Sequence, residues 1–150
     1  MGVTVRLLQV REVYGLRRSV LRAADPAATV HYPTDDDPAT WHMGAVDDVG
    51  TVIATSTFFA EPCPLDPASA GALRLRSMAV LPARQGEGIG RAVLEHALAR
   101  ARAQGATFVW ANARDSALGF YRRCGFEISE LHFVEPETGL AHTVVTRALG

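Results

Sequence analysis

One stretch of the chain, residues 73–104, restricts the fold more than any other. Residues 73–76 alternate apolar and basic side chains, which is the period of a strand, and Pro82 ends the strand because proline has no N–H to donate. Glycines follow at 86, 88 and 90, and residues 88–104 then have the period of a helix that ends before Gly105. Its apolar face consists of Ile89, Val93, Leu94, Ala97, Leu98 and Ala101. The sequence predicts a strand, a glycine loop and a helix.

The start of this helix is a candidate phosphate site. Backbone N–H groups in the first turn of a helix have no acceptor within the helix, and the helix dipole favours an anion there. Arg91 in that turn opposes the dipole, and a bound phosphate would make its charge favourable. Glu87 has the opposite effect, because it suits the dipole and repels phosphate. An ordinary connection without a ligand is the alternative interpretation.

Two common phosphate-binding motifs do not fit the loop. A P-loop needs Lys and then Ser or Thr after its last glycine, but Gly90 precedes Arg91 and Ala92. A dinucleotide-binding loop needs a third glycine where this chain has Arg91.

Residues 85–90, read as Q-x-x-G-x-G, instead resemble the Q/R-x-x-G-x-G/A loop of the GCN5-related N-acetyltransferases (GNAT). The resemblance continues through Asn112, expected to end a strand, and through F-Y-x-x-x-G-F at residues 120–126. These motifs cover about residues 73–127. Residues 16–45 more loosely resemble the ElaA-like branch of that superfamily.

This resemblance implies an α/β fold with three layers. A mixed, mostly antiparallel sheet of about seven strands would be flanked by helices, with a splayed central parallel pair. The implied reaction is direct transfer of an acetyl group from acetyl-CoA, the co-substrate, to a primary amine of a small molecule or peptide in a ternary complex. No metal is implied.

The resemblance also implies roles for residues of the loop and of the second motif. Tyr121 would give a proton to the leaving thiolate, a transfer from a pKa near 10 to one near 8.5 that costs about 2 kcal/mol. The main chain of residues 78–80 would pair with the pantetheine arm. The expected cofactor contacts are Met78, Ala79, Val80, Arg84, Gln85, Gly86, Glu87, Gly88, Ile89, Gly90, Arg91, Asn112 and Arg123.

Composition sets the remaining bounds. The 150 residues suffice for a single domain over 1–150, and 48% hydrophobic with 21% charged residues indicates a globular chain. No apolar run approaches about 18 residues, the start lacks a signal-peptide core, and two cysteines do not make a disulfide framework. We expect a cytoplasmic protein with free thiols and no membrane partner. The net charge of −1 gives no reason to expect nucleic acid, and a homodimer stays open.

Periodicity and turn residues predict the other elements. Residues 13–22 should form a helix with its arginines, Arg17 included, opposite the apolar side, and Pro26 should close it. Ser116 should cap a helix that runs to about Cys124. The expected strands are residues 3–7, 42–46, 51–59, 73–80, 108–111, 127–133 and 140–147.

The general base has several candidates. They are His42, His142, Glu61 and the acids Asp35–Asp37. We choose His42 because histidine needs the least tuning near neutral pH, although a hydrogen-bonded structural histidine is the alternative. The three acids read as a solvated turn and helix cap, or else as a patch that selects a cationic amine. Trp41 reads as a core residue or as part of an acceptor pocket.

Two other functions stay open. A CoA-binding or acyl-CoA-binding sensor, or an inactive paralogue, would keep the same loop without transferase activity. A nucleotide-binding regulatory domain would use the loop for ATP or NAD, although it would lack the P-loop lysine and the third dinucleotide glycine.

Overall fold

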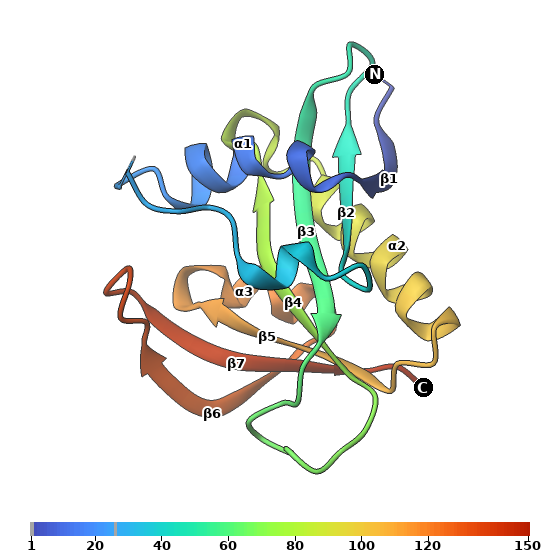
Figure 1. The fold of residues 1–150 in the computed structure, drawn as a ribbon, viewed down its shortest axis with the longest axis vertical. Helices are drawn as coiled ribbons and strands as arrows, with labels where there is room; N and C mark the ends of the chain where they lie inside the picture. The colour runs from blue at the N-terminus through green and yellow to red at the C-terminus, as the bar shows by residue number, and fades with distance from the viewer. Residues whose placement is uncertain (1, 26) are drawn as a thin grey trace. The chain divides into compact units, whose positions relative to one another are not determined.

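The computed structural model describes residues 2–25 and 27–150 (Figure 1). Seven strands form one mixed sheet in the order β1-β2-β3-β4-β5-β7-β6, flanked by helices, with β4 and β5 parallel and the pairs β1–β2, β2–β3, β5–β7 and β6–β7 antiparallel. This confirms the expected GNAT-like architecture. The strands are β1 (Thr4–Leu8), β2 (Trp41–Val46), β3 (Val52–Ala60), β4 (Ala72–Val80), β5 (Phe108–Arg114), β6 (Glu127–Val134) and β7 (Ala141–Ala148).

Helical structure occurs at the three predicted positions, residues 13–22, 88–104 and 116–124, and also in short turns that were not predicted. The helical segments are η1 (Val10–Glu12), α1 (Tyr14–Leu16), η2 (Arg17–Leu21), η3 (Pro33–Asp36), η4 (Pro82–Arg84), α2 (Ile89–Ala103), η5 (Asp115–Ala117) and α3 (Leu118–Arg123). The helical run that begins at Val10 ends at Leu21, and Pro26, predicted to close it, lies outside the described residues. No described helix combines the length and apolarity needed to span a membrane.

The chain packs as two compact units, each built from two separate segments. Unit 1 contains the residues up to Phe59 together with Arg76–Arg100, and unit 2 contains Ala60–Leu75 and Ala101–Gly150. The strand β4 therefore contributes its first half to unit 2 and its second half to unit 1.

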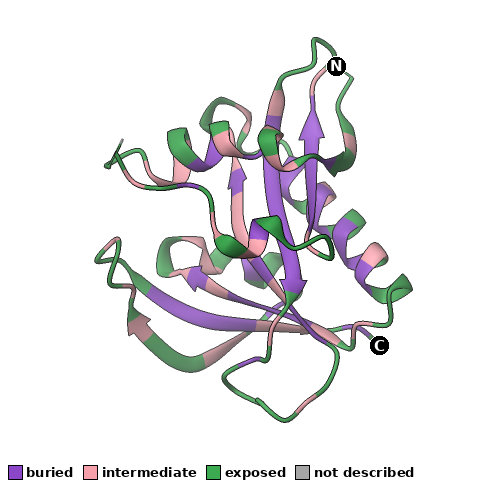
Figure 2. Cartoon of the chain, in the orientation of Figure 1, coloured by how far each residue is buried: buried purple, intermediate pink, exposed green. Residues whose placement is uncertain are grey.

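In unit 1, β2 and β3 are buried along almost their whole length (Figure 2). A strand that is buried at successive positions must be covered on both faces. The α1–η2 segment lies over one face of these strands and α2 lies behind the other (Figure 1). All six residues of the predicted apolar face of α2 are buried. The helix therefore packs as its sequence period predicts.

Gly44 allows β2 to pack closely against its neighbours. A Cβ atom there would lie 2.3 Å from Cδ1 of Leu8 on β1 and 2.4 Å from the carbonyl oxygen of Ala54 on β3. Both distances are far below van der Waals contact, so this position requires glycine. The packing holds the strand that carries His42.

In unit 2, α3 packs beside β5 and β6, and an apolar cluster lies around Trp110. Cys63, Ala72, Trp110 and Val144 form the buried centre of that cluster. Both cysteines are buried free thiols, as expected. Ser116 does not cap a helix: it lies inside η5, and α3 begins after Ala117 without a side-chain cap. The residue types of this segment do not predict the extra turn, η5, before the helix.

The parallel pairing of β4 and β5 is short. It joins Ala72–Leu75 to Phe108–Ala111, although β4 continues to Val80 and β5 to Arg114. Within the described residues the ladder thus ends part-way along both strands, as expected for a splayed pair. Ser77, just beyond this point on β4, has a φ of 57°, in the left-handed region that non-glycine residues rarely adopt.

Candidate active site

The glycine loop of unit 1 is tied to the strands at its start. The N–H of Leu81 donates to the carbonyl of Ile53 at 2.8 Å, and Gln85 Nε2 donates back to the carbonyl of Val80 at 3.2 Å. Pro82 opens η4, where its fixed φ is suited to a helical turn. The Gln85 side chain therefore closes the loop between β4 and α2.

Gly86 and Gly88 give the loop its backbone course. Their φ values are 83° and 80°, and a Cβ atom at either position would meet no other atom within 4 Å. Glycine is thus favoured at both positions by the positive φ of the backbone and not by a lack of space for a side chain. After the loop, Ala92 is the first residue whose N–H makes a helical hydrogen bond, and it donates to the carbonyl of Gly88. No described residue accepts a hydrogen bond from the N–H groups of residues 86–91, so these donors are available to an anion.

Two charged side chains of the loop bind each other. Arg84 Nε lies 3.1 Å from both carboxylate oxygens of Glu87, and both side chains are partly exposed. Glu87 therefore neutralises one of the two arginines expected to meet phosphate. Arg91, the other, is exposed in the first turn of α2.

An open hollow of about 540 Å³ in unit 1 lies beside this loop. Val3 and Val5 form its apolar side, and Arg84, Glu87 and His96 are the charged or titratable residues that line it. Gly88 and Ile89 also line it, so the hollow reaches the donors at the start of α2.

The predicted cofactor strand, Met78–Val80, follows the left-handed Ser77 on β4. Ala79 is buried, whereas Met78 and Val80 are half-buried. The side chains thus alternate in burial, as in a strand with one covered face.

In unit 2, Tyr121 is a buried residue of α3. Its ring lies edge-on to Phe120 at 5.3 Å and to Phe126 at 5.2 Å between centroids. Burial raises the pKa of its phenol, with a smaller contribution from Cys124. No described residue bonds the Tyr121 hydroxyl. The phenol therefore stays protonated and keeps a donor for a ligand.

Asn112 lies inside β5, opposite Val144, two residues before the strand ends at Arg114. Its Oδ1 atom is buried and has no hydrogen-bond partner among the described residues. A buried orphan acceptor indicates a missing donor such as water or a ligand. Arg123, by contrast, is exposed and lies over Gly119 of the same helix.

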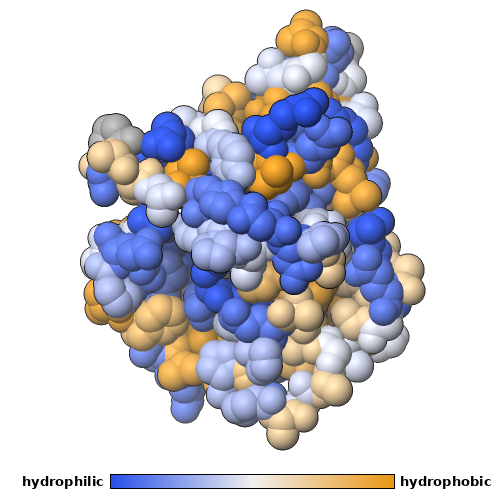
Figure 3. All heavy atoms as spheres, in the orientation of Figure 1, coloured by the Kyte–Doolittle hydropathy of each residue, from blue (hydrophilic) through white to orange (hydrophobic). Residues whose placement is uncertain are grey.

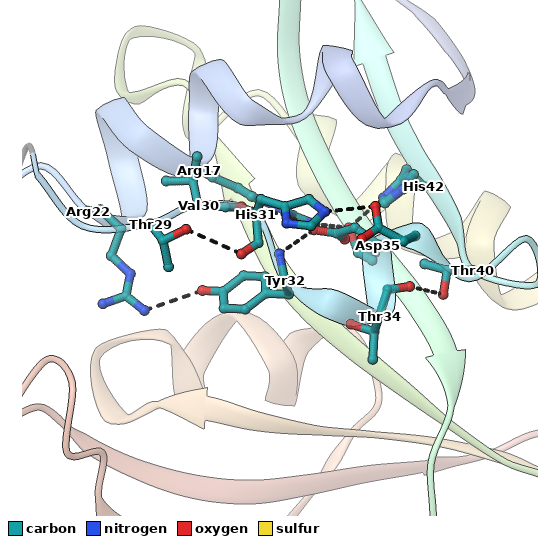
Figure 4. A network of polar contacts seen from close by, with 12 residues as sticks. Arg17, Arg22, Thr29, Val30, His31, Tyr32, Thr34, Asp35, Thr40 and His42 are labelled. Carbon is teal, nitrogen blue, oxygen red and sulfur yellow. Dashed lines mark hydrogen bonds and ion pairs between the residues drawn. The ribbon is translucent and has the colours of Figure 1, made fainter.

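A buried polar network lies around Arg17 in unit 1 (Figure 4). The Arg17 guanidinium, only 1% exposed, donates to Asp35 Oδ2 at 2.7 Å and to Oδ1 at 3.0 Å. It also donates to the carbonyl of Val30 and to Thr57 Oγ1, each at 2.8 Å. Asp35 further accepts from the N–H of Tyr32 at 2.8 Å. Segment 30–35 is thus fastened to the first helical run and to β3.

Opposing causes set the pKa of Asp35. Burial alone would raise it, but the hydrogen bonds from Arg17 and from the Tyr32 N–H together outweigh burial, and the pKa lies below its usual value. Asp35 is therefore ionised at neutral pH, and its charge is matched by Arg17.

His42 joins the same network from β2. It is 5% exposed, and its Nδ1 lies 2.7 Å from Thr57 Oγ1. Burial is the largest cause that lowers its pKa, the Arg17 charge lowers it further, and Asp35 opposes both. His42 is therefore neutral at pH 7.

The sequence did not predict this network. A regular helical period places Arg17 opposite the apolar side of the helix, whereas Arg17 is buried. The run changes from a 3₁₀ turn (η1) to an α turn and then to a π-helix (η2), so a uniform 3.6-residue period does not apply. The solvated-turn interpretation holds only for Asp36 and Asp37, which are exposed. Hydrophilic side chains gather over the η3 segment on the face shown in Figure 3.

The other candidate bases are engaged within their own units. Asp36 pairs with His31 at 2.9 Å, and Glu61 binds Arg74 at 2.8 Å. His142 is buried, donates from Nδ1 to the carbonyl of Leu140 and stacks on Phe133. Trp41 stacks on Phe58 with 4.5 Å between centroids, which makes it a core residue.

Comparison with known proteins decides the family. Residues 10–126 match the Acetyltransferase (GNAT) family. This chain is a member of the GNAT family. It is 30% identical over 123 residues to the uncharacterised N-acetyltransferase YitI of Bacillus subtilis strain 168, covering 82% of this chain and 81% of that protein.

Solved GNAT structures share the fold. A Lactobacillus plantarum protein assigned as an N-acetyltransferase superposes with a TM-score of 0.80 at 17% identity, over the whole of both chains. The ribosomal-protein-S18-alanine N-acetyltransferase of Escherichia coli gives a TM-score of 0.75 at 17% identity, covering 99% of this chain and 95% of that one. The family expectation is confirmed, and the ElaA-like branch stays a prediction.

Proposed function

We propose that this GNAT protein transfers an acetyl group from acetyl-CoA directly to a primary amine of a small molecule or peptide in a ternary complex. One observation carries the proposal. The loop at residues 86–91 presents a run of unbonded N–H groups at the start of α2, with Arg84 and Arg91 beside them. A pyrophosphate suits such a run of donors, and acetyl-CoA contains one.

Acyl transfer from a thioester then needs donors for the carbonyl oxygen, a proton for the thiolate and a neutral amine. In our proposal the main chain of Met78–Val80 pairs with the pantetheine arm and supplies the donor. Tyr121 protonates the leaving sulfur. The buried, unpartnered Oδ1 of Asn112 supports a cofactor contact at that residue.

A CoA-binding sensor without transferase activity is the second candidate. It is favoured by the engagement of Glu61, Asp35, Asp36 and His142, since each already bonds another residue of its unit.

An amine panel with acetyl-CoA separates the two functions. Release of CoA thiol that depends on the amine, with an acetylated product found by mass spectrometry, is the result expected of a transferase. Tight binding without amine-dependent turnover would support the sensor. All 15 cationic residues of the Lys and Arg class are arginines, so lysine acetylation of the protein itself cannot contribute to the signal.

A further inference from the structure

Two histidines of this chain bond a buried threonine hydroxyl through Nδ1. His42 lies 2.7 Å from Thr57 Oγ1 in unit 1, and His132 lies 2.8 Å from Thr143 Oγ1 in unit 2. A hydroxyl group has one proton to donate. Each threonine hydroxyl also bonds a third residue. Whether that third partner donates or accepts determines which atom holds the proton between threonine and histidine.

For Thr57 the third partner is a donor. Arg17 Nη2 donates to Thr57 Oγ1 at 2.8 Å, and an arginine has no acceptor to offer in return. Thr57 is fully buried, so its own proton needs an acceptor, and among the described residues that acceptor is His42 Nδ1. Neutral His42 consequently carries its proton on Nε2.

For Thr143 the third partner is an acceptor. Its hydroxyl donates to Asp115 Oδ1 at 2.7 Å, because a carboxylate can only accept. The threonine proton is then used, so His132 must donate from Nδ1, and in the neutral form of the ring Nε2 carries no proton. The two histidines thus hold opposite tautomers.

The outer nitrogen of His42, Nε2, has no bond to any described residue, and it is not one of the buried polar atoms without a partner, although the residue is only 5% exposed. Nε2 therefore reaches the surface, where its N–H can donate to an external acceptor. A neutral imidazole that presents N–H has no lone pair to take a proton from an ammonium group at that nitrogen.

We infer that His42 binds the acceptor as a hydrogen-bond donor, from Nε2–H to a carbonyl or carboxylate oxygen next to the reacting amine, with Arg17 and Thr57 as its positioning residues. This rests on the proposed function and narrows its substrates to amines that carry such an oxygen. It gives His42 a different role from the general base that the sequence predicts.

The low pKa of His42, caused by burial and by Arg17, agrees with this role. Asp35 is the charged group that opposes the shift, and Arg17 pairs with it. The neutral donor form is thereby kept at the pH of an amine acetylation.

NMR of the ¹⁵N-histidine-labelled full chain at pH 7.5 tests the tautomers without any substrate. We expect protonated Nε2 for His42 and protonated Nδ1 for His132. Thr57→Val should allow His42 to adopt either tautomer and leave His132 unchanged. Thr57→Ser, which keeps the hydroxyl, should keep His42 protonated at Nε2. Thr143→Val should affect His132 alone. A His42 that is protonated at Nδ1 in the unaltered protein would overturn the inference.

A matched pair of amines tests the substrate class. Alaninamide carries a carbonyl oxygen beside its amine, and isopropylamine lacks it. We expect KM about tenfold lower for alaninamide, a difference lost in His42→Leu and partly restored in His42→Gln, whose amide keeps an N–H. Equal KM values in the unaltered enzyme, or a loss of kcat by about 10²-fold or more in both variants with KM unchanged, would contradict donation and indicate a base.

Failure of the proposed transferase function would give a different result from failure of this inference. If no amine of the panel is acetylated, the transferase proposal fails, while the NMR result still decides which nitrogen of His42 holds the proton.

Discussion

Arg17 shows how one side chain organises its surroundings. Four of its five N–H donors are used, by Asp35, Val30 and Thr57, and only Nε lacks an acceptor. A buried ion pair contributes little net stability, but removal of one partner leaves an uncompensated charge. The pair therefore specifies where segment 30–35 lies relative to β3, both in unit 1.

Asp35→Asn should destabilise the protein strongly. Arg17 would remain buried and charged without its carboxylate, which costs about 3–5 kcal/mol in comparable buried pairs. Urea unfolding at pH 7 measures the loss. Asp36→Asn is the matched control, since the Asp36 side chain is 73% exposed and should change stability by less than about 0.5 kcal/mol. Similar losses in the two variants would contradict the network.

The effect of Asp35→Asn should depend on pH. The folded pKa of Asp35 is depressed, so its contribution is complete above the unfolded value of about 3.9 and is lost as pH falls through the folded pKa. The stability difference between the unaltered protein and the variant should thus be constant from pH 7 to 5 and shrink below about pH 4. A difference that grows on acidification would reverse the assigned sign.

Tyr121→Phe should lower kcat by about 10²–10⁴ and leave acetyl-CoA affinity nearly unchanged, because the sulfur gains its charge mainly in the transition state. The ring contacts with Phe120 and Phe126 survive, so the melting temperature should shift little. Asn112→Ala provides the contrast and should mainly weaken cofactor binding. Single-turnover kinetics measure the chemical step, and an unaltered rate there would reduce Tyr121 to a packing residue.

At the scale of elements, the segment from β4 through the loop to α2 combines a strand, a loop held by Gln85, and a helix. The N–H groups in the first turn of that helix have no acceptor among the described residues. Gly86 and Gly88 set the loop course by their positive φ, and the buried face of α2 fixes the helix against the sheet of unit 1. The donors are therefore ordered before any ligand arrives, which lowers the entropic cost of binding.

Gly88→Asp should abolish stabilisation by acetyl-CoA, because its carboxylate would occupy and repel the pyrophosphate site. Gly50→Asp is a matched control. Gly50 also has a positive φ, 89°, and open space around it, so both variants carry similar backbone strain. Thermal shift with and without acetyl-CoA measures the response. Normal stabilisation of Gly88→Asp would place the phosphate elsewhere.

Glu87→Gln should tighten acetyl-CoA binding, because it frees Arg84 from the bond at 3.1 Å and removes a like charge beside the phosphate. At a solvated site we expect about 0.5–1.5 kcal/mol, most at low salt. Calorimetry at two ionic strengths measures it. Asp48→Asn, with the same change of net charge on the exposed β2–β3 turn, should have no effect. Unchanged affinity in Glu87→Gln would show that the pair does not face the ligand.

At the scale of the whole molecule, both units are discontinuous in sequence, and each draws on one half of β4. Neither unit is therefore a contiguous piece of chain that could be cut out, and ligand binding is best measured on the full chain.

Acetyl-CoA and CoA should raise the global unfolding temperature, whereas ATP and NAD should not. A ligand at about 100 times its Kd adds about 2.7 kcal/mol to the free energy of unfolding. A fluorescence melting curve over a ligand series measures this. Stabilisation by ATP or NAD comparable to that by acetyl-CoA would favour the nucleotide-binding alternative.

The sequence by itself determined the local elements and the family. Period, proline and glycine located β4, the loop and α2, since these signals act within a few residues of the chain. The apolar face of α2 was also predicted correctly, because burial on one face of a helix leaves a regular pattern.

Only the tertiary structure decided the partners of polar side chains. Arg17 meets Asp35 and Thr57 across 18 and 40 residues, and a change of helix type turns Arg17 inward. The left-handed Ser77, the end of the parallel ladder at Leu75 and the tautomer of His42 also depend on neighbours distant in sequence. A hydrogen bond is defined by direction and distance in space, and residue types along the chain carry neither.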